Sequence, residues 1–468
     1  MHTGAWPQVI QGGMGIGISD WRLARAVASR GQLGVVSGTG IDTVFVRRLQ
    51  DGDPDGDLRR VMARFPMAEV AEDAERDWFI EGGRAPDAPY RLLPMYHVGV
   101  PLAREQLTML AAFCEVALAK EGHDGVVGMN LLTKVQFPTL ASLYGAMLAG
   151  VDVVIMGAGI PREVPGVLDA FAEHRPARMR LETIGGGAAE PVYLSLDPSA
   201  CWTELPAPLA RPAFFPIVSS NSLATMLARK ANGRVDGFVV EGATAGGHNA
   251  PPRGTPVFNE RGEPLYGPRD AVDLAALAEL GLPFWVAGGA GGPAERRAAL
   301  AAGAAGIQVG TLFAYAEESG LEASLKRSVL EAVQRGEVDV YTDAQASPTG
   351  YPFKVVRWPE APSTERERIC DLGYLRVVYH RDDGRLGYRC AAEPVRAFVQ
   401  KGGEEAETCG RRCLCNVLMA DIALGQVRPD GRVEPPLLTS GDGLLAAGTF
   451  LDGRTAYTAG DVLEYLLA

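Results

Sequence analysis

Residues 235–248 read VDGFVVEGATAGGH, an apolar run followed by a glycine-rich turn that ends on a histidine. The run from Val235 to Val240 predicts a short buried strand, because apolar runs of this length bounded by turn residues are typical of one. The paired glycines Gly246 and Gly247 let a backbone come close to a flat or anionic ligand, since no Cβ stands in the way. His248 can donate, accept or transfer a proton near neutral pH. Taken alone, the segment fits a simple glycine turn beside a surface histidine as well as it fits a ligand site.

The same alternation of apolar runs and helical patterns continues along the whole chain. The eight predicted strands are residues 8–11, 33–37, 125–132, 151–156, 214–219, 235–240, 284–287 and 306–309. The run at 192–196 is interpreted as an extra or peripheral strand. Eight strand–helix units predict an α/β fold of the TIM (β/α)8 barrel class. An open doubly wound sheet is the alternative, but its G-x-G-x-x-G fingerprint does not follow the first strand.

Two regions interrupt the alternation. Residues 51–124 are charged and irregular, and they predict an insertion after the second βα unit. From about residue 320 the pattern becomes helical and then mixed. We therefore expect a barrel over residues 1–319, a C-terminal substrate or lid domain over 320–455, and a terminal helix over 456–468 that packs back on the barrel.

The composition excludes several classes of protein. The chain has 468 residues, of which 47% are hydrophobic and 22% charged, as in ordinary globular proteins. A net charge of −12 argues against nucleic-acid partners, and no apolar run approaches the roughly 20 residues that span a bilayer. Residues 1–7 lack the basic and apolar regions of a secretory signal, and seven cysteines favour reduced thiols. We expect a cytoplasmic protein without membrane or nucleic-acid partners.

Small-residue segments follow the predicted strands at the same end. They lie at residues 12–15, 245–248, 287–292 and 310–311, with Asn130 and Ser219 at two further strand ends. In a parallel barrel, ligands bind at the carboxyl ends of the strands. The last two predicted strands are neighbours, where barrels often bind a phosphate through backbone N–H groups. Tight turns without any ligand are the alternative interpretation.

Four motifs in these segments resemble the nitronate monooxygenase family, formerly called 2-nitropropane dioxygenase. They are IQGGMG at residues 10–15, EGATAGGH at 241–248, AGG at 287–289 and QVGTLF at 308–313. They occur in the order of the family, and the likeness covers roughly residues 8–50 and 125–318. The resemblance implies a flavin-binding TIM barrel, related to the FMN-dependent enoyl-ACP reductases. The insertion and the C-terminal region are larger than in compact members of the family.

The resemblance implies FMN as the cofactor. Met14 would offer a soft apolar surface beside the flavin ring, and Asn130 would offer its amide to the ring or the ribityl chain. Thr311 would help the neighbouring glycines to hold the phosphate. The residues assigned to FMN on this basis are Gly13, Met14, Gly15, Asn130, Ser219, Glu241, Gly246, Gly247, Gly288, Gly289, Gly310 and Thr311. Lys134 is a weaker candidate.

His248 is the predicted catalytic residue, because in the family the histidine after Ala-Gly-Gly faces the substrate near the flavin. It would take the α-proton of a neutral nitroalkane, or orient and neutralise a nitronate that is already ionised. The resemblance further implies that the flavin accepts an electron from the nitronate before oxygen reacts. Many relatives carry a glycine close behind the histidine, whereas residues 249–253 read NAPPR here. His97, in the insertion, is a further candidate to line the mouth of the barrel beside His248.

We therefore expect an FMN-dependent nitronate monooxygenase-like oxidoreductase, with a small-molecule substrate, O2, and a homodimer as one expected assembly. An NAD(P)H-dependent enoyl-thioester reductase and a non-catalytic flavin-bound component of a biosynthetic complex are the alternatives. We expect no metal site, because the C-x-x-x-C-x-C spacing of Cys409, Cys413 and Cys415 is not a usual zinc motif. Cys413 and Cys415 are interpreted as packed thiols at the start of an apolar helix.

Overall fold

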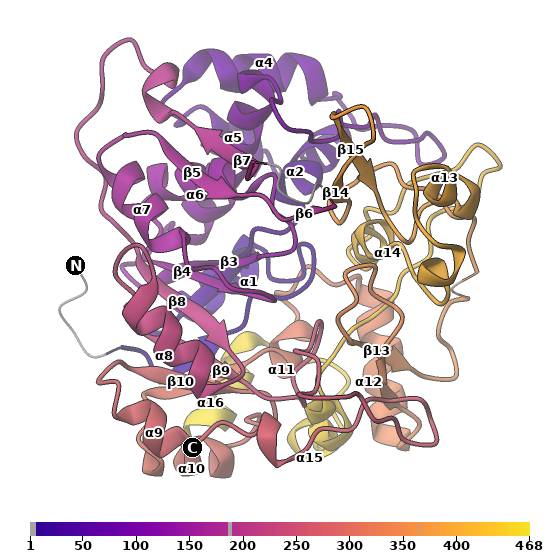
Figure 1. The fold of residues 1–468 in the computed structure, drawn as a ribbon. Helices are drawn as coiled ribbons and strands as arrows, with labels where there is room; N and C mark the ends of the chain where they lie inside the picture. Colours follow the sequence, from indigo (N-terminus) through magenta and orange to yellow (C-terminus); the bar gives the residue numbers. More distant parts are fainter. Residues whose placement is uncertain (1–5, 186–189, 364) are drawn as a thin grey trace.

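The computed structural model describes residues 6–185, 190–363 and 365–468, and it contains an eight-stranded parallel barrel sheet (Figure 1). Residues 1–5, most of the segment in which no secretory signal was found, lie outside the described residues. The order around the sheet is β1-β11-β10-β9-β8-β4-β3-β2. Its strands are β1 (Val9–Gln11), β2 (Gly34–Ser37), β3 (Val127–Leu132), β4 (Val153–Gly157), β8 (Ala213–Val218), β9 (Phe238–Glu241), β10 (Phe284–Ala287) and β11 (Gly306–Val309). All eight predicted barrel strands are present.

The two ends of the sheet meet and close the barrel. The N–H of Leu33 donates to the carbonyl of Val9 at 3.1 Å, and the N–H of Gln11 donates to the carbonyl of Leu33 at 2.9 Å. Inside, a separate apolar cluster fills the barrel, formed by Ile10, Leu33, Val35, Val153, Ile155, Phe215, Val239, Trp285 and Ala287. The fully buried indole of Trp285 donates to the carbonyl of Pro7 at 2.9 Å, which satisfies its polar atom. Because side chains pack the interior, any ligand site lies at a mouth of the barrel.

The outer helices follow from amphipathic sequences with suitable caps. Asp20 accepts hydrogen bonds from the first turn of α1, and Ser220 accepts one from α8, as an N-cap does. The helices associated with the barrel are α1 (Trp21–Ala28), α2 (Ile41–Gln50), α6 (Thr139–Leu148), α7 (Val164–Ala172), α8 (Asn221–Lys230), α9 (Leu274–Ala278), α10 (Pro293–Ala301) and α11 (Thr311–Ala314).

The insertion between β2 and β3 is helical. It contains α3 (Asp57–Met62), α4 (Ala68–Trp78) and α5 (Leu102–Ala119). Helix α5 packs against α1, α2 and α6, and nearly all of its residues are buried. It therefore joins the outer layer of the barrel, while α4 lies further out with two buried residues (Figure 1).

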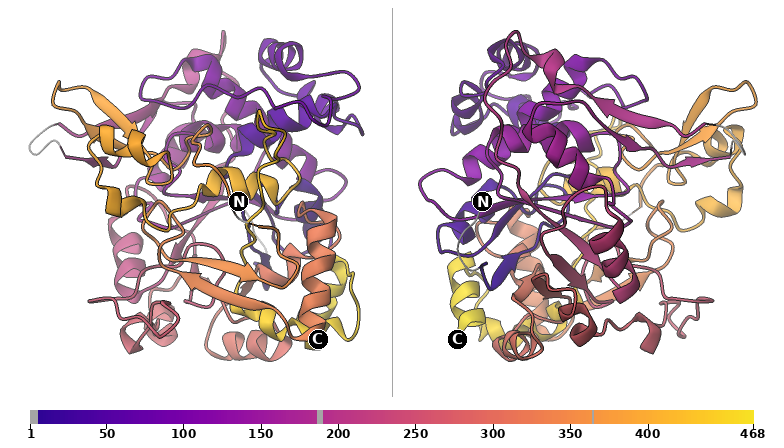
Figure 2. Two further views of the ribbon diagram at one scale, coloured as in Figure 1. Left: turned by 90° about the vertical axis from the view of Figure 1, so that its right-hand side faces the viewer. Right: turned by 60° about the vertical axis from the view of Figure 1, so that its left-hand side comes forward.

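A second excursion, between α7 and β8, forms three short strands outside the barrel. These are β5 (Ala177–Arg180), β6 (Thr183–Ile184) and β7 (Tyr193–Leu196). β7 pairs with β5, as expected for a peripheral strand, and β6 pairs with β14 (Val377–His380) of the C-terminal region. β14 also pairs with β15 (Leu386–Arg389), and this small sheet projects from the body of the barrel (Figure 2).

The region after the barrel runs alongside it and returns to its outer layer. Its other elements are α12 (Ala323–Arg335), β12 (Asp339–Asp343), β13 (Phe353–Arg357), α13 (Val395–Gln400), α14 (Leu414–Ala420), α15 (Ala447–Leu451) and α16 (Ala459–Leu467). Thr458 caps α16 through a capping box with Asp461, and α16 packs against α1 and α10. Among the described residues, no helix is long and apolar enough to cross a membrane.

Candidate functional site

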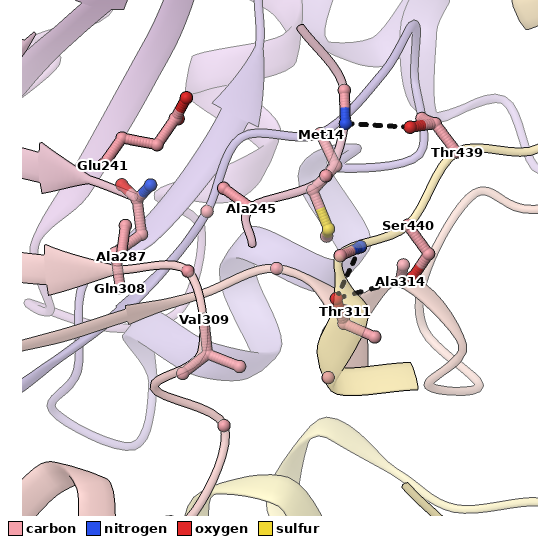
Figure 3. Close-up of a pocket in the computed structure, with 18 of the residues that line it drawn as sticks. Met14, Glu241, Ala245, Ala287, Gln308, Val309, Thr311, Ala314, Thr439 and Ser440 are labelled. Atoms are coloured by element: carbon pink, nitrogen blue, oxygen red, sulfur yellow. Dashed lines mark hydrogen bonds between the residues drawn. The ribbon is translucent and has the colours of Figure 1, made fainter. Parts of the chain in front are cut away.

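A cavity of about 440 Å³ lies at the carboxyl ends of the barrel strands. Turns after β1, β3, β9, β10 and β11 line it, together with segments from the C-terminal region (Figure 3). The cavity brings together these predicted site residues: Gly13, Met14, Gly15, Asn130, Glu241, Gly246, Gly247, His248, Gly288, Gly289, Gly310 and Thr311. Ser219 is not among the lining residues; its carbonyl accepts a hydrogen bond from the Arg253 guanidinium at 3.1 Å.

The turn after β10 forms a cradle of backbone N–H groups at one end of the cavity. Gly288 and Gly289 have φ values of +83° and +69°, which favour glycine, and Gly292 is the N-cap of α10. In the described part of the chain, the N–H groups of residues 289–292 have no protein acceptor. Consecutive free N–H groups before a helix bind anions. The Glu295 carboxyl group lines the same end and would oppose an anion there.

Three polar side chains at the strand ends face the cavity without sufficient protein partners. The Oδ1 atom of Asn130 and the Oε1 atom of Gln308 are buried and have no hydrogen-bond partner among the described residues. Glu241 is enclosed by the same cavity, and burial raises the pKa of its carboxyl to about 8. Glu241 and Gln308 occupy one layer of the sheet, since each pairs in register with Ala287 (Figure 3). Buried polar groups of this kind are usually satisfied, so they indicate a polar ligand.

His248 lies between the cavity and the β12–β13 hairpin. Its Nε2 is 2.7 Å from the hydroxyl oxygen of Ser347, and its ring packs edge-on against Phe353 with 4.9 Å between centroids. Burial lowers the pKa of His248 to about 4, so the imidazole is neutral at pH 7. Within the described residues, no hydrogen bond is found for Nδ1. The neutral ring therefore has one nitrogen available to donate to a ligand or to accept from one.

A C-terminal loop closes the cavity over the Gly-Gly-His turn. Thr439 accepts a hydrogen bond from the N–H of Gly247 at 2.8 Å, and Thr311 accepts one from the N–H of Gly441 at 3.1 Å (Figure 3). A Cβ added to Gly246 would lie 2.7 Å from the carbonyl carbon of Ser440. The absence of a side chain at Gly246 therefore serves the contact with this loop. Thr311, which also lies 3.4 Å from the Ser440 hydroxyl, keeps its own proton to donate.

The described lining of the cavity contains no lysine or arginine. Lys134, the weaker candidate, is not part of it: its ammonium forms an ion pair with Glu182 at 2.9 Å. His97 is exposed and also does not line the cavity. The side chains of Ile18, Leu131, Leu132, Ile217, Phe353 and Leu418 give the cavity apolar surface.

The cysteines of the C-terminal region lie away from this cavity. Cys413 and Cys415 are buried, whereas Cys409 is exposed. The Cys413 sulfur accepts a hydrogen bond from the Asn416 side chain at 3.4 Å. Among the described residues, no group of three or more His, Cys, Asp or Glu side chains is arranged to hold a metal ion.

The comparison with protein families gives one match. The model described as "Nitronate monooxygenase" matches residues 209–350, which run from before β8 into the loop before β13. Over these residues, the sequence matches the nitronate monooxygenase family. The match includes the Gly-Gly-His turn, the N–H cradle and the histidine's serine partner. This match supports an oxidoreductase and leaves its substrate open.

Three solved structures show distant similarity. FabK from Thermotoga maritima has 16% identity and a TM-score of 0.49, over 98% of this chain and 91% of that one. Nitroalkane oxidase from Streptomyces ansochromogenes has 16% identity and a TM-score of 0.48, with 98% and 94% covered. The enoyl reductase domain of MlnA from Bacillus amyloliquefaciens has 11% identity and a TM-score of 0.49, with 98% and 93% covered. These similarities are too distant to indicate a function. No curated protein matches the sequence.

Several residues around the cavity were not predicted. Gln308 could have been predicted from the sequence, because it begins the motif QVGTLF at residues 308–313 and lies near the carboxyl end of a predicted strand. Ser347, Phe353 and the loop at 439–441 had none, because they reach the site from about 100 to 190 residues further along the chain.

Proposed function

We propose that this chain is an FMN-dependent oxidoreductase that oxidises alkyl nitronates with O2. The observation that carries the proposal is the pairing, in one cavity, of a free N–H cradle at residues 289–292 with the neutral, enclosed His248. The first suits a phosphate group and the second suits a small polar reacting group.

The residues present fit FMN. The N–H cradle and the Thr311 hydroxyl would hold the single phosphate, because both can donate at the same end of the cavity. The unpartnered oxygens of Asn130 and Gln308 would accept N–H or O–H groups of the flavin or its ribityl chain. Met14 would contribute an apolar surface to the ring. FMN, when bound, supplies the redox chemistry by accepting electrons from the substrate and passing them to O2.

His248 would bind and orient the substrate by a hydrogen bond from its free nitrogen. A histidine whose pKa is about 4 is a weak base, so it is poorly suited to removing the α-proton of a neutral nitroalkane. It can donate an N–H to a nitronate oxygen without changing its own charge. This favours a substrate that arrives already ionised. Neutral nitroalkanes would then react more slowly.

The substrate side of the cavity favours a short alkyl chain. Its described lining combines aliphatic side chains with Phe353 and lacks a cationic group. A second negative charge on the substrate would therefore have no partner and would lie in the same cavity as Glu295. Because Phe353, Leu418 and the loop at 439–441 all come from residues 320–455, we propose that this region is the substrate-side domain.

A direct test is oxygen uptake by FMN-reconstituted protein with 2-propyl nitronate, and with the neutral 2-nitropropane at the same pH. We expect turnover with the nitronate and much slower turnover with the nitroalkane. His248→Ala should retain FMN and lose at least about tenfold in rate, because a hydrogen bond to a charged group contributes about 1.5–3 kcal/mol. FMN binding without oxygen uptake from either compound would contradict the proposed activity.

A further inference from the structure

The C-terminal hairpin holds His248 in a chain of hydroxyl groups. Ser347 is fully buried, and its Oγ lies 2.7 Å from His248 Nε2 and 2.8 Å from Thr349 Oγ1. The N–H of Thr349 donates to the same Ser347 oxygen at 3.2 Å. The N–H of Tyr351 donates to Thr349 Oγ1 at 3.3 Å. The hydroxyl groups of Thr349 and Ser347 therefore link the hairpin to the imidazole of His248 through successive hydrogen bonds.

The hairpin loop that carries this chain is itself fixed. The Arg411 guanidinium donates to the carbonyl of Ser347 at 2.7 Å, and the N–H of Arg412 donates to the carbonyl of Ala346 at 2.8 Å. On the histidine side, the N–H of Asn249 donates to the carbonyl of Pro352 at 2.9 Å. Backbone and side-chain contacts thus set the Ser347–His248 distance from both partners.

Two orders of protons along these hydrogen bonds are possible, and each fixes one tautomer of the imidazole. Ser347 Oγ has one proton and two lone pairs, and the Thr349 N–H occupies one of those lone pairs. If Thr349 Oγ1–H fills the other, Ser347 donates its own proton to His248 Nε2. In the opposite order, His248 Nε2–H donates to Ser347, and the hydroxyl proton of the partly exposed Thr349 turns to solvent. The first order keeps both hydroxyl protons within the chain of hydrogen bonds, and it leaves the ring proton on Nδ1, where an anionic ligand in the cavity can accept it.

We propose that Ser347 and Thr349 are positioning residues that hold His248 as the neutral Nδ1–H tautomer, so that it presents an N–H donor to the cavity. The inference rests on the proposed function, because the oxygen of an ionised nitronate accepts hydrogen bonds and is therefore served by the order that leaves the proton on Nδ1. A serine that merely filled space behind the ring would leave the two tautomers free to exchange.

The test is the ¹⁵N spectrum of the histidine side chains in flavin-free, ¹⁵N-histidine-labelled protein at pH 7. The chain has six histidines, and His248→Gln identifies the signals of this one. We expect the wild-type His248 to show a protonated Nδ1 and an unprotonated Nε2. Ser347→Ala and Thr349→Val should each introduce the Nε2–H form, whereas Thr349→Ser, which keeps the hydroxyl, should retain the wild-type pattern.

Two outcomes would overturn the inference: a wild-type protein with the proton on Nε2, or a Ser347→Ala variant with an unchanged tautomer. If Ser347→Ala does not fold, Thr349→Val and Thr349→Ser still test the inference. Position 349 is partly exposed, so these substitutions should disturb the fold less. In oxygen uptake, Thr349→Val should lower kcat/KM for a nitronate several-fold at unchanged FMN content, and Thr349→Ser should not. If the spectra behave as expected but no nitronate is oxidised, the proposed activity is wrong and the hydroxyl chain is right.

Discussion

Replacing Glu241 by glutamine should stabilise the flavin-free protein, and by an amount that depends on pH. Burial raises the pKa of this carboxyl from 4.5 to about 8, which means that the folded protein holds a proton that the unfolded chain releases. Stability is therefore fully present below pH 4.5 and falls as the pH rises toward 8. At about 1.4 kcal/mol per pH unit, the cost is about 3 kcal/mol at pH 7 and below about 1 kcal/mol at pH 5.

The glutamine side chain has nearly the same shape and carries no charge at any of these pH values. Urea unfolding of the wild type and of Glu241→Gln at pH 5, 6, 7 and 8 measures the difference, provided that the slopes agree. Glu81→Gln, at an exposed position of the insertion, controls for the loss of one negative charge. We expect the gain from Glu241→Gln to be small at pH 5 and to grow to about 3 kcal/mol at pH 7. A gain that is the same at both pH values, or no gain at all, would refute the assignment of a buried, protonated carboxyl at the cavity.

Three further changes test other parts of the account. Glu295→Gln should tighten FMN binding several-fold, as measured by fluorescence titration, because it removes a like charge beside the N–H cradle; weaker binding would show that the phosphate lies elsewhere. Gly246→Ala should lower the melting temperature by several degrees, because the added Cβ would collide with the 439–441 loop. Gly291→Ala is the control, since its Cβ would meet no atom within 4 Å. Equal melting temperatures of the two variants would contradict the packing argument. Propionate 3-nitronate should have at least about a tenfold lower kcat/KM than an alkyl nitronate of equal length without the carboxylate, since about 1.4 kcal/mol for an unpaired carboxylate is a modest penalty; equal values would point to a cation that the described lining lacks.

The barrel could be predicted because its strands are buried on both sides. Runs such as Phe284–Ala287 are apolar throughout, and most of the strands are followed by glycine at the same end. Strand ends alone therefore predicted cavity residues correctly, except for Ser219, which does not line the cavity and whose carbonyl faces Arg253. The short strand β5 was not predicted, because its residues alternate between partly buried and exposed, whereas the run at 192–196 was predicted as a peripheral strand and forms β7. Helix α4 was missed for a similar reason, since only Ala71 and Ala74 are buried in a strongly charged sequence.

The C-terminal contribution to the site could not be predicted from local sequence. Ser347 and Thr439 are ordinary loop residues until the fold brings them to His248 and Gly247, across separations of 99 and 192 residues. The sequence suggested that Gly246 gives a ligand access to the backbone, whereas the structure places the Ser440 backbone against it. The enclosure that lowers the pKa of His248 also depends on the packing of this region, so the preference for an ionised substrate could not be derived from the motif.

The central claim is that a nitronate delivers electrons to a flavin held in the barrel cavity. Anaerobic mixing of FMN-loaded protein with 2-propyl nitronate, and separately with NADH and NADPH, measures this directly through the flavin absorbance. We expect rapid loss of the oxidised flavin spectrum with the nitronate alone, and a much slower change in His248→Ala. Reduction by NADH or NADPH with no response to the nitronate would contradict it and favour an enoyl-thioester reductase. No response to any of the three donors would instead favour a non-catalytic flavin protein.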